Sequence, residues 1–80
     1  MSETKKVNKK PPFEPFQVIV TSSRLNVRKS ASKSGEVLNQ ITDHGTYTVT
    51  RYATGKDSAF GWGYLREVKG WVSLYYCKRV

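Results

Sequence analysis

Apolar and polar residues alternate with a period of two over most of the chain after residue 15. No window has the i, i+3, i+4, i+7 spacing of an amphipathic helix. β-branched and aromatic residues are frequent in the alternating stretches, as is typical of strands. The pattern predicts short strands at residues 16–22, 24–29, 46–52, 61–68 and 70–74. Turn-rich segments are expected at residues 29–36, 42–45, 53–61 and 67–70.

Short strands with turns at intervals of about 8–12 residues are typical of a small barrel or sandwich. We therefore predict an all-β fold of about five to seven short antiparallel strands. Around the second strand, the alternation turns Leu25 and Val27 inward and Asn26 and Arg28 outward. The predicted core comprises Leu25, Val27, Val37, Ile41, Val49, Leu65, Val72 and Leu74.

The first fifteen residues, MSETKKVNKKPPFEP, differ in composition from the rest of the chain, with four lysines, three prolines and few apolar side chains. Such a segment buries too little apolar surface to offset the entropy of ordering it. We interpret residues 1–15 as a flexible linker or leader and residues 16–80 as one domain. A domain of this size is near the lower limit for folding alone, which favours a binding module over an enclosed catalytic cleft.

The chain is basic, with a formal net charge of +8 at pH 7. Four lysines against two glutamates give +2 in residues 1–15, and ten bases against four acids give +6 in residues 16–80. Because the domain itself is basic, a polyanionic partner is favoured: nucleic acid, acidic lipid or an anionic polymer. No apolar run approaches the roughly 18 residues of a membrane-spanning helix, so no membrane partner is expected.

His44 and Cys77 are the only histidine and the only cysteine. A catalytic zinc site needs three protein ligands and a structural site needs four, so neither a metal nor another cofactor is expected. A Cys–His nucleophilic pair is conceivable, but His44 is predicted in a turn and Cys77 in an apolar position of the last strand. We therefore expect no catalytic residues.

Four motifs follow one another in the predicted domain: LNVR at 25–28, the glycine turn and strand DHGTYTVT at 43–50, GWGYL at 61–65 and GWVSLYY at 70–76. In this order and at these separations they resemble the bacterial SH3-type domain (SH3b), over residues 16–80. Such domains form the wall-binding end of phage endolysins and bacterial peptidoglycan hydrolases. The connection at residues 53–61 is longer than the family pattern leads one to expect.

The resemblance implies an SH3-like barrel and a non-catalytic module that targets a lysin to Gram-positive cell walls. The implied partners are peptidoglycan or another anionic wall polymer, a catalytic domain N-terminal to this chain, and a homo-oligomer or an assembly with the full-length lysin. The basic N-terminus lacks the apolar segment of a secretory signal. We expect synthesis in the cytoplasm of a phage-infected bacterium and action at the wall after release.

The predicted domain has more aromatic side chains than its core can absorb, and rigid amphipathic rings suit sugar and peptide recognition. These surplus rings are Tyr47, Tyr52, Phe60, Trp62, Tyr64, Tyr75 and Tyr76. The predicted ligand-binding residues are Asn26, Arg28, Tyr52, Phe60, Trp62, Tyr64, Trp71 and Tyr75.

Structural roles remain open for several of these residues. Trp71 is equally suited to packing, after a hairpin turn that Gly70 is expected to permit. Arg28 suits a bidentate contact with a ligand carboxylate or phosphate, and equally a salt bridge that pins the following loop. The remaining lysines are expected to form a solvated surface that speeds encounter without selecting a ligand. These are Lys29, Lys33, Lys56, Lys69 and Lys78.

Two other functions compete with wall binding. Small basic β-barrels with exposed aromatics also bind nucleic acids, which makes this the main alternative. A proline-rich peptide adaptor of the eukaryotic SH3 type is disfavoured, because its ligands usually bring basic residues to an acidic loop. The corresponding loop here, RKSASKSGE at residues 28–36, is basic.

Overall fold

The computed structural model describes residues 13–55 and 57–80, so most of the predicted linker and Lys56 lie outside the described residues. Seven strands and one short 3-10 helix (η1) form the described part of the chain. They are β1 (Phe16–Val20), β2 (Leu25–Arg28), β3 (Val37–Ile41), β4 (Thr46–Gly55), β5 (Ser58–Leu65), β6 (Gly70–Ser73), η1 (Leu74–Tyr76) and β7 (Cys77–Arg79).

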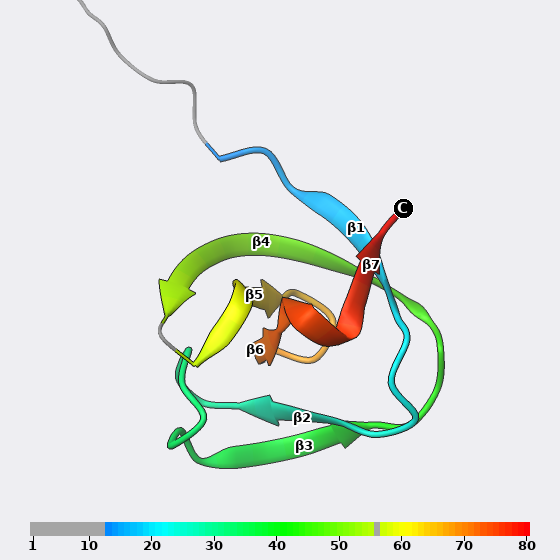
Figure 1. The fold of residues 1–80 in the computed structure, drawn as a ribbon. Helices are drawn as coiled ribbons and strands as arrows, with labels where there is room; N and C mark the ends of the chain where they lie inside the picture. Colours follow the sequence, from blue (N-terminus) through cyan, green and yellow to red (C-terminus); the bar gives the residue numbers. More distant parts are fainter. Residues whose placement is uncertain (1–12, 56) are drawn as a thin grey trace, which may run out of the picture.

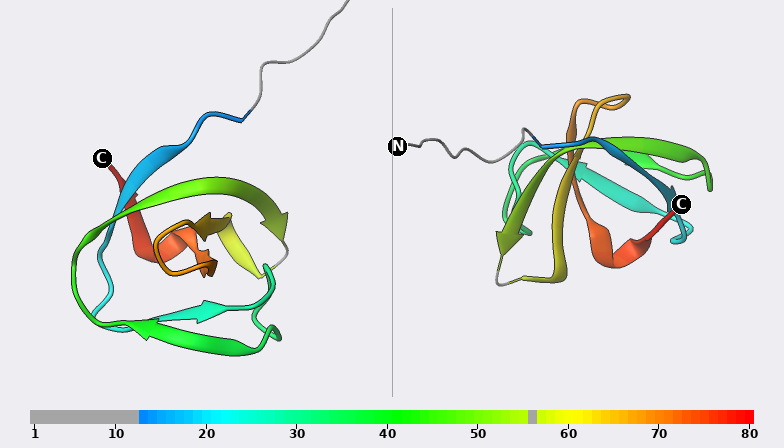
Figure 2. Two further views of the ribbon diagram at one scale, coloured as in Figure 1. Left: turned by 180° about the vertical axis from the view of Figure 1, so that it is seen from behind. Right: turned by 90° about the horizontal axis from the view of Figure 1, so that it is seen from above.

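All seven strands belong to one antiparallel sheet, in the order β3-β2-β6-β5-β4-β1-β7. The sheet curls on itself: β4 arches over one side, β2 and β3 close the opposite side, and β5, β6 and η1 lie between them (Figure 1). The view from behind has the same rounded outline, with β1 and β7 side by side (Figure 2). The predicted small all-β fold is confirmed.

The core consists of aliphatic side chains from the inward faces of six strands. Its buried members are Val18, Val20, Leu25, Val27, Ile41, Val49, Leu65 and Val72. Six of the eight predicted core residues are among them, and Leu74 packs against them while partly buried. Burying each such side chain contributes roughly 1.5–3 kcal/mol, so a core this small has little redundancy.

Val37 was predicted in the core, and this prediction is wrong: its side chain is 45% exposed. A β-bulge between Val27 and Arg28 shifts the register of β2 against β3. The shift places Val37 opposite Arg28, whose side chain faces outward, instead of opposite an inward residue. Leu38 is exposed as well, at 48%, so β3 is exposed on both faces over residues 37–40, in keeping with its position at the edge of the sheet.

The predicted connection at residues 53–61 is largely strand. β4 continues to Gly55 and β5 begins at Ser58, with Ala53 opposite Trp62 and Gly55 opposite Ser58. Irregularities between Val49 and Arg51 and between Ala53 and Gly55 break the alternation in β4, so the ladder continues where the sequence pattern ends. The additional length is therefore a two-stranded extension of the sheet.

Thr48 in β4 is a buried polar residue, 5% exposed. Its backbone N–H and its hydroxyl both donate to the Glu67 carboxylate, over 2.8 and 2.7 Å. Desolvation acts to raise the pKa of Glu67, but the hydrogen bonds from Thr48 outweigh it and hold the pKa below its usual 4.5. Glu67, in the turn between β5 and β6, thus supplies acceptors for the buried N–H and hydroxyl groups of Thr48 in β4.

The turn between β5 and β6 places the strained backbone at Lys69, with φ 54°, and not at Gly70. The Lys69 N–H donates to the Leu65 carbonyl over 2.8 Å. Gly70 is required by packing instead: a Cβ at this position would overlap Val27 Cγ1 and lie 3.2 Å from the Arg28 carbonyl oxygen. The expectation that Gly70 permits the turn is therefore corrected.

The described residues contain no helix with the length and apolar character needed to span a membrane.

We predict that Gly70→Ala lowers the free energy of unfolding by about 1–3 kcal/mol, because the added methyl group overpacks the core against Val27. Denaturant unfolding followed by tryptophan fluorescence measures the change. Gly45→Ala is the matched control, since the nearest atom to its added Cβ is a side-chain oxygen of Asp43, 3.2 Å away, outside the core. Equal effects of the two substitutions would contradict the role assigned to Gly70.

Candidate ligand-binding groove

Two adjoining hollows lie between β2, the loop that follows it, and η1. The larger, about 370 Å³, is lined by Asn26, Arg28, Trp62 and neighbours from the 22–25 turn. The smaller, about 220 Å³, is lined by Asp57, Ser58, Ala59, Ser73 and Tyr75. Lys33 and Tyr76 line both. We call the two together the groove, with an Arg28 end and an Asp57 end that meet at Lys33 and Tyr76.

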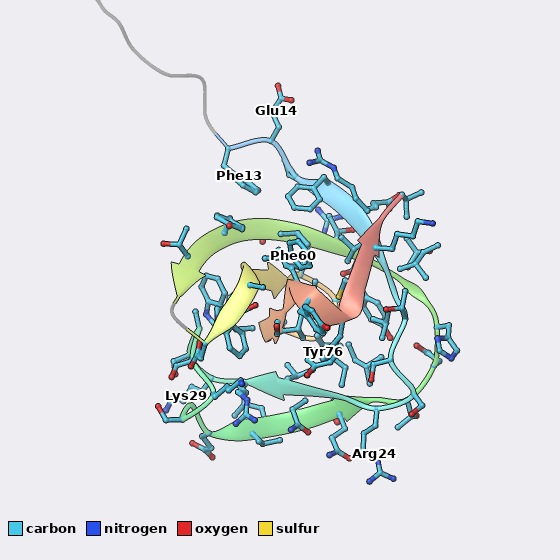
Figure 3. The ribbon with its side chains drawn as sticks, viewed as in Figure 1. Phe13, Glu14, Arg24, Lys29, Phe60 and Tyr76 are labelled. Atoms are coloured by element: carbon cyan, nitrogen blue, oxygen red, sulfur yellow. The ribbon has the colours of Figure 1, made fainter. Side chains whose placement is uncertain are left out.

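The 3-10 helix η1 sets the aromatic wall of the groove. In a strand, consecutive side chains alternate between faces, whereas a 3-10 turn rotates them by about 120° per residue. Tyr75 and Tyr76 are therefore both exposed, at 57% and 43%, with their rings in a T-shaped contact at 5.1 Å. The Thr21 N–H and hydroxyl donate to the Tyr76 carbonyl over 2.9 and 3.0 Å, which anchors η1 beside β1. Figure 3 shows Tyr76 on η1, with Phe60 on the same side of the molecule.

Asp57 joins the groove to the loop after β2. One carboxylate oxygen accepts the Trp62 indole N–H over 3.0 Å, and the other accepts the Lys33 backbone N–H over 2.8 Å. The Lys33 backbone hydrogen bond is the main reason that the pKa of Asp57 lies below its usual 3.8, and the Trp62 hydrogen bond adds to it. Trp62 itself is 2% exposed. Its ring therefore forms the floor of the Arg28 end and is not a free face for stacking.

Arg28 is held in place by its own loop. Its Nη1 group donates to the Gly35 carbonyl over 2.9 Å, across residues 29–36. The expected alternative of a pinning contact is thus present, with a backbone carbonyl as its acceptor. Asn26 is also oriented, because its Oδ1 accepts a hydrogen bond from Gln40 Nε2 over 2.8 Å. Both residues line the Arg28 end, where the sequence predicted a ligand contact.

Tyr52 and Phe60 lie outside the groove, in a third hollow of about 410 Å³ that we call the Phe60 pocket. Its lining also includes Phe16, Leu74, Lys78 and Arg79. Gly61, with φ 84°, lies so close to the Tyr52 ring that a Cβ would collide with it, and the neighbouring Phe60 is 61% exposed. Phe60 also stacks on Tyr75, with centroids 5.9 Å apart and planes at 17°. The Phe60–Tyr75 stack therefore separates the Phe60 pocket from the groove.

Tyr64 and Trp71 are cross-strand neighbours on the outer face of β5 and β6, and Trp71 is also the β-ladder partner of Arg28 in β2. Their rings meet edge to face at 5.5 Å, and the Arg51 guanidinium lies 5.1 Å from the centre of the Tyr64 ring. Neither lines the groove or the Phe60 pocket. The structure thus divides the eight predicted residues into three places: four in or beneath the groove, two in the Phe60 pocket and two on this outer face.

Sequence reasoning left Tyr76, Lys33 and Asp57 out of the predicted site. Tyr76 was counted among the surplus rings but not among the ligand-binding residues, and Lys33 was grouped with the solvated lysines. The available signal was the YYC sequence after Leu74, because two adjacent tyrosines cannot both follow strand alternation into the core. Asp57 had no local signal, since its two partners lie five residues later in β5 and 24 residues earlier.

His44 and Cys77 both lie beside Val20 of β1. The His44 Nδ1 atom lies 2.9 Å from the Val20 carbonyl oxygen, and Cys77 is the β-ladder partner of Val20. Burial raises the pKa of the Cys77 thiol to about 11, so it stays protonated at neutral pH. Within residues 13–55 and 57–80, no three His, Cys, Asp or Glu side chains are grouped to hold a metal ion.

Comparison with models of known protein families, with curated proteins and with solved structures gave no match to this chain.

We predict that the Asp57 clamp is lost under acid conditions. A carboxyl whose pKa is lower in the folded state stabilises that state at pH values above its unfolded pKa, and this contribution disappears as the pH falls through the folded value. Because the pKa of Asp57 is below 3.8, the clamp is intact at neutral pH and opens below about that value. Hydrogen exchange of the Lys33 amide and the NMR signal of the Trp62 indole N–H should both report the opening.

Asp57→Asn tests the same contact at neutral pH. The amide oxygen of asparagine can replace only one of the two carboxylate acceptors, so protection of the Lys33 amide or of the Trp62 indole N–H should fall without acid. Glu36→Gln is a matched control, because Glu36 is exposed and its backbone carbonyl, which the substitution leaves intact, accepts the Lys29 N–H. Unchanged exchange at both N–H groups in Asp57→Asn would contradict the clamp.

Proposed function

We propose that the domain is a non-catalytic cell-wall-binding module that recognises peptidoglycan in Gram-positive walls through the groove. The supporting observation is the continuity of the groove: a basic end and an acidic end are joined by Lys33 and the exposed ring of Tyr76. The motifs that resemble SH3b domains agree with this proposal. Hydrolysis would then be supplied by a separate catalytic domain of a lysin.

The shape of the groove suits an extended ligand of modest size. Two adjoining hollows of about 220 and 370 Å³ accommodate a few peptide or sugar units. Their contact area is smaller than the interface that a globular partner requires. Rigid tyrosine rings provide contact area at a low cost in conformational entropy. A face this small gives modest affinity at one site, and repeated wall epitopes raise the apparent affinity when several copies are tethered together.

The net charge contributes in a different way. Exposed cations increase the rate of encounter with an anionic wall, but their attraction is screened over about 8 Å at physiological salt. Groove contacts are short-range and resist screening. Salt dependence therefore separates recognition by the groove from attraction by charge alone.

A fluorescent fusion of the domain, added to intact Gram-positive cells and to purified sacculi, tests the proposal. Staining of both should persist at a salt concentration that screens long-range attraction. Tyr76→Ala should weaken binding to sacculi by about tenfold, which corresponds to about 1.4 kcal/mol. Tyr52→Ala is the matched control, because Tyr52 is similarly exposed, at 47%, but lies in the Phe60 pocket.

Two results would contradict this prediction. Sacculi that remain unstained would exclude wall binding. Equal losses in Tyr76→Ala and Tyr52→Ala would remove the groove as the binding site. A circular dichroism spectrum and an unfolding midpoint for each variant confirm that the fold is retained.

Nucleic-acid binding is the second candidate, favoured by the Phe60–Tyr75 stack beside Lys78 and Arg79. Stacked rings next to cations suit the bases and phosphates of a single strand. A gel-shift experiment with single-stranded DNA and RNA distinguishes this candidate. Tight binding with a steep dependence on salt, together with absence of staining on sacculi, would favour it.

A further inference from the structure

The two ends of the groove differ in the hydrogen bonds that they have left to offer a ligand. At the Arg28 end, the Asn26 carbonyl oxygen is occupied by Gln40, so its NH₂ group remains as the free part of the amide. The Ser22 hydroxyl is also occupied on both sides: it donates to the Arg24 carbonyl over 2.9 Å, and its oxygen accepts the Arg24 N–H over 3.3 Å. What remains for a ligand at this end is predominantly donors.

The Arg28 guanidinium strengthens this donor character. One of its N–H groups is fixed on the Gly35 carbonyl, so the planar guanidinium is already oriented. Its other N–H groups can bind a ligand without a further change in the conformation of Arg28. Lys33 adds a second positive charge where the two ends meet. Among the described residues that line the Arg28 end, none is acidic. This end therefore suits a carboxylate or another planar anion.

The Asp57 end has the opposite character. The Ser58 hydroxyl donates to the Gly61 carbonyl over 2.7 Å, so in its 2.7 Å contact with Ser73 the Ser73 hydroxyl must be the donor. Both hydroxyl protons are used within the protein, and lone pairs remain. The Asp57 carboxylate adds a negative charge. This end accepts hydrogen bonds and suits an amine or amide N–H.

We propose that the groove binds a peptide in one direction, with a free terminal carboxylate at the Arg28 end and an amine-bearing residue at the Asp57 end. Tyr76 lines both ends, and in this arrangement its ring packs against the peptide backbone between the carboxylate and the amine-bearing residue. The inference rests on the proposed function and names its ligand within the wall: a peptide with a free carboxyl terminus. A glycerol phosphate polymer supplies anions and hydroxyl groups but no cationic amine, so it leaves the Asp57 carboxylate without an opposite charge.

Titration of the full chain with Nα-acetyl-Lys-D-Ala-D-Ala, followed by isothermal calorimetry and NMR shifts, tests the direction. The free-carboxylate peptide should bind at least about tenfold more tightly than its C-terminal amide, and more tightly than its Nε-acetyl form. Poly(glycerol phosphate) should bind more weakly than the peptide at physiological salt. Equal affinity for the acid and the amide, or tighter binding of the polymer, would overturn the inference.

Asn26→Asp tests the donor end with little disturbance of the fold. Aspartate keeps the oxygen that accepts from Gln40 but replaces the free NH₂ with negative charge, so affinity for the free-carboxylate peptide should fall at least about tenfold. Asn39→Asp is the matched control: it adds the same charge in β3 and keeps the oxygen that accepts the Gln40 N–H. Equal losses in the two variants would show a general charge effect and overturn the assignment.

Binding to sacculi keeps the two proposals distinguishable. A protein that stains sacculi but does not discriminate between the acid and the amide retains the proposed function and loses this inference. A protein that selects the free-carboxylate peptide but does not stain sacculi supports the directional groove and loses the assignment to the wall.

Discussion

Burial of the Trp62 indole sets a requirement that organises the groove. A buried N–H group needs an acceptor, because leaving it without one costs about 1–3 kcal/mol. Asp57 supplies this acceptor from the turn of the β4–β5 hairpin, and its second oxygen holds the Lys33 amide. One carboxylate therefore fixes the floor of the Arg28 end, the loop at its side and the boundary with the Asp57 end. If it were displaced, the loop after β2 would lose a tether to the β4–β5 hairpin.

The surplus of aromatic residues has four structural outcomes. Trp62 is fully enclosed, and Tyr64 and Trp71 cover each other on the outer face of the sheet. Tyr47 packs partly buried against the core, with its hydroxyl donating to Asp43. The remaining rings gather around η1, where Tyr75 contacts both Phe60 and Tyr76. A small barrel has too little interior for these rings, so their clustering on one side supports recognition of a ligand more strongly than their number does.

Strand alternation was sufficient to predict the all-β fold and the inward positions of Leu25 and Val27, because these two residues alternate with Asn26 in the regularly paired part of β2. It failed for Val37, which lies on the exposed edge strand β3, and at the end of β4, where irregular pairing carries the strand on to Gly55. Asn26 and Arg28 line the groove, where the outward positions of β2 were predicted to meet a ligand. Tyr76 was missed because η1 changes the period from two to three, and Asp57 because its partners are distant in sequence.

The cations of this chain have two different physical roles, and their surroundings decide which. Lys78 lies on an edge strand, where a charged side chain is strongly hydrated and discourages pairing with another sheet. Arg28 is half-buried, and its hydrogen bond to Gly35 limits the conformations that a ligand would otherwise have to restrict. Net charge therefore accounts for attraction to an anionic surface, whereas selection among anions requires a cation held in one geometry. In the groove, that cation faces an acidic end across a tyrosine ring, and this asymmetry gives a bound chain a direction.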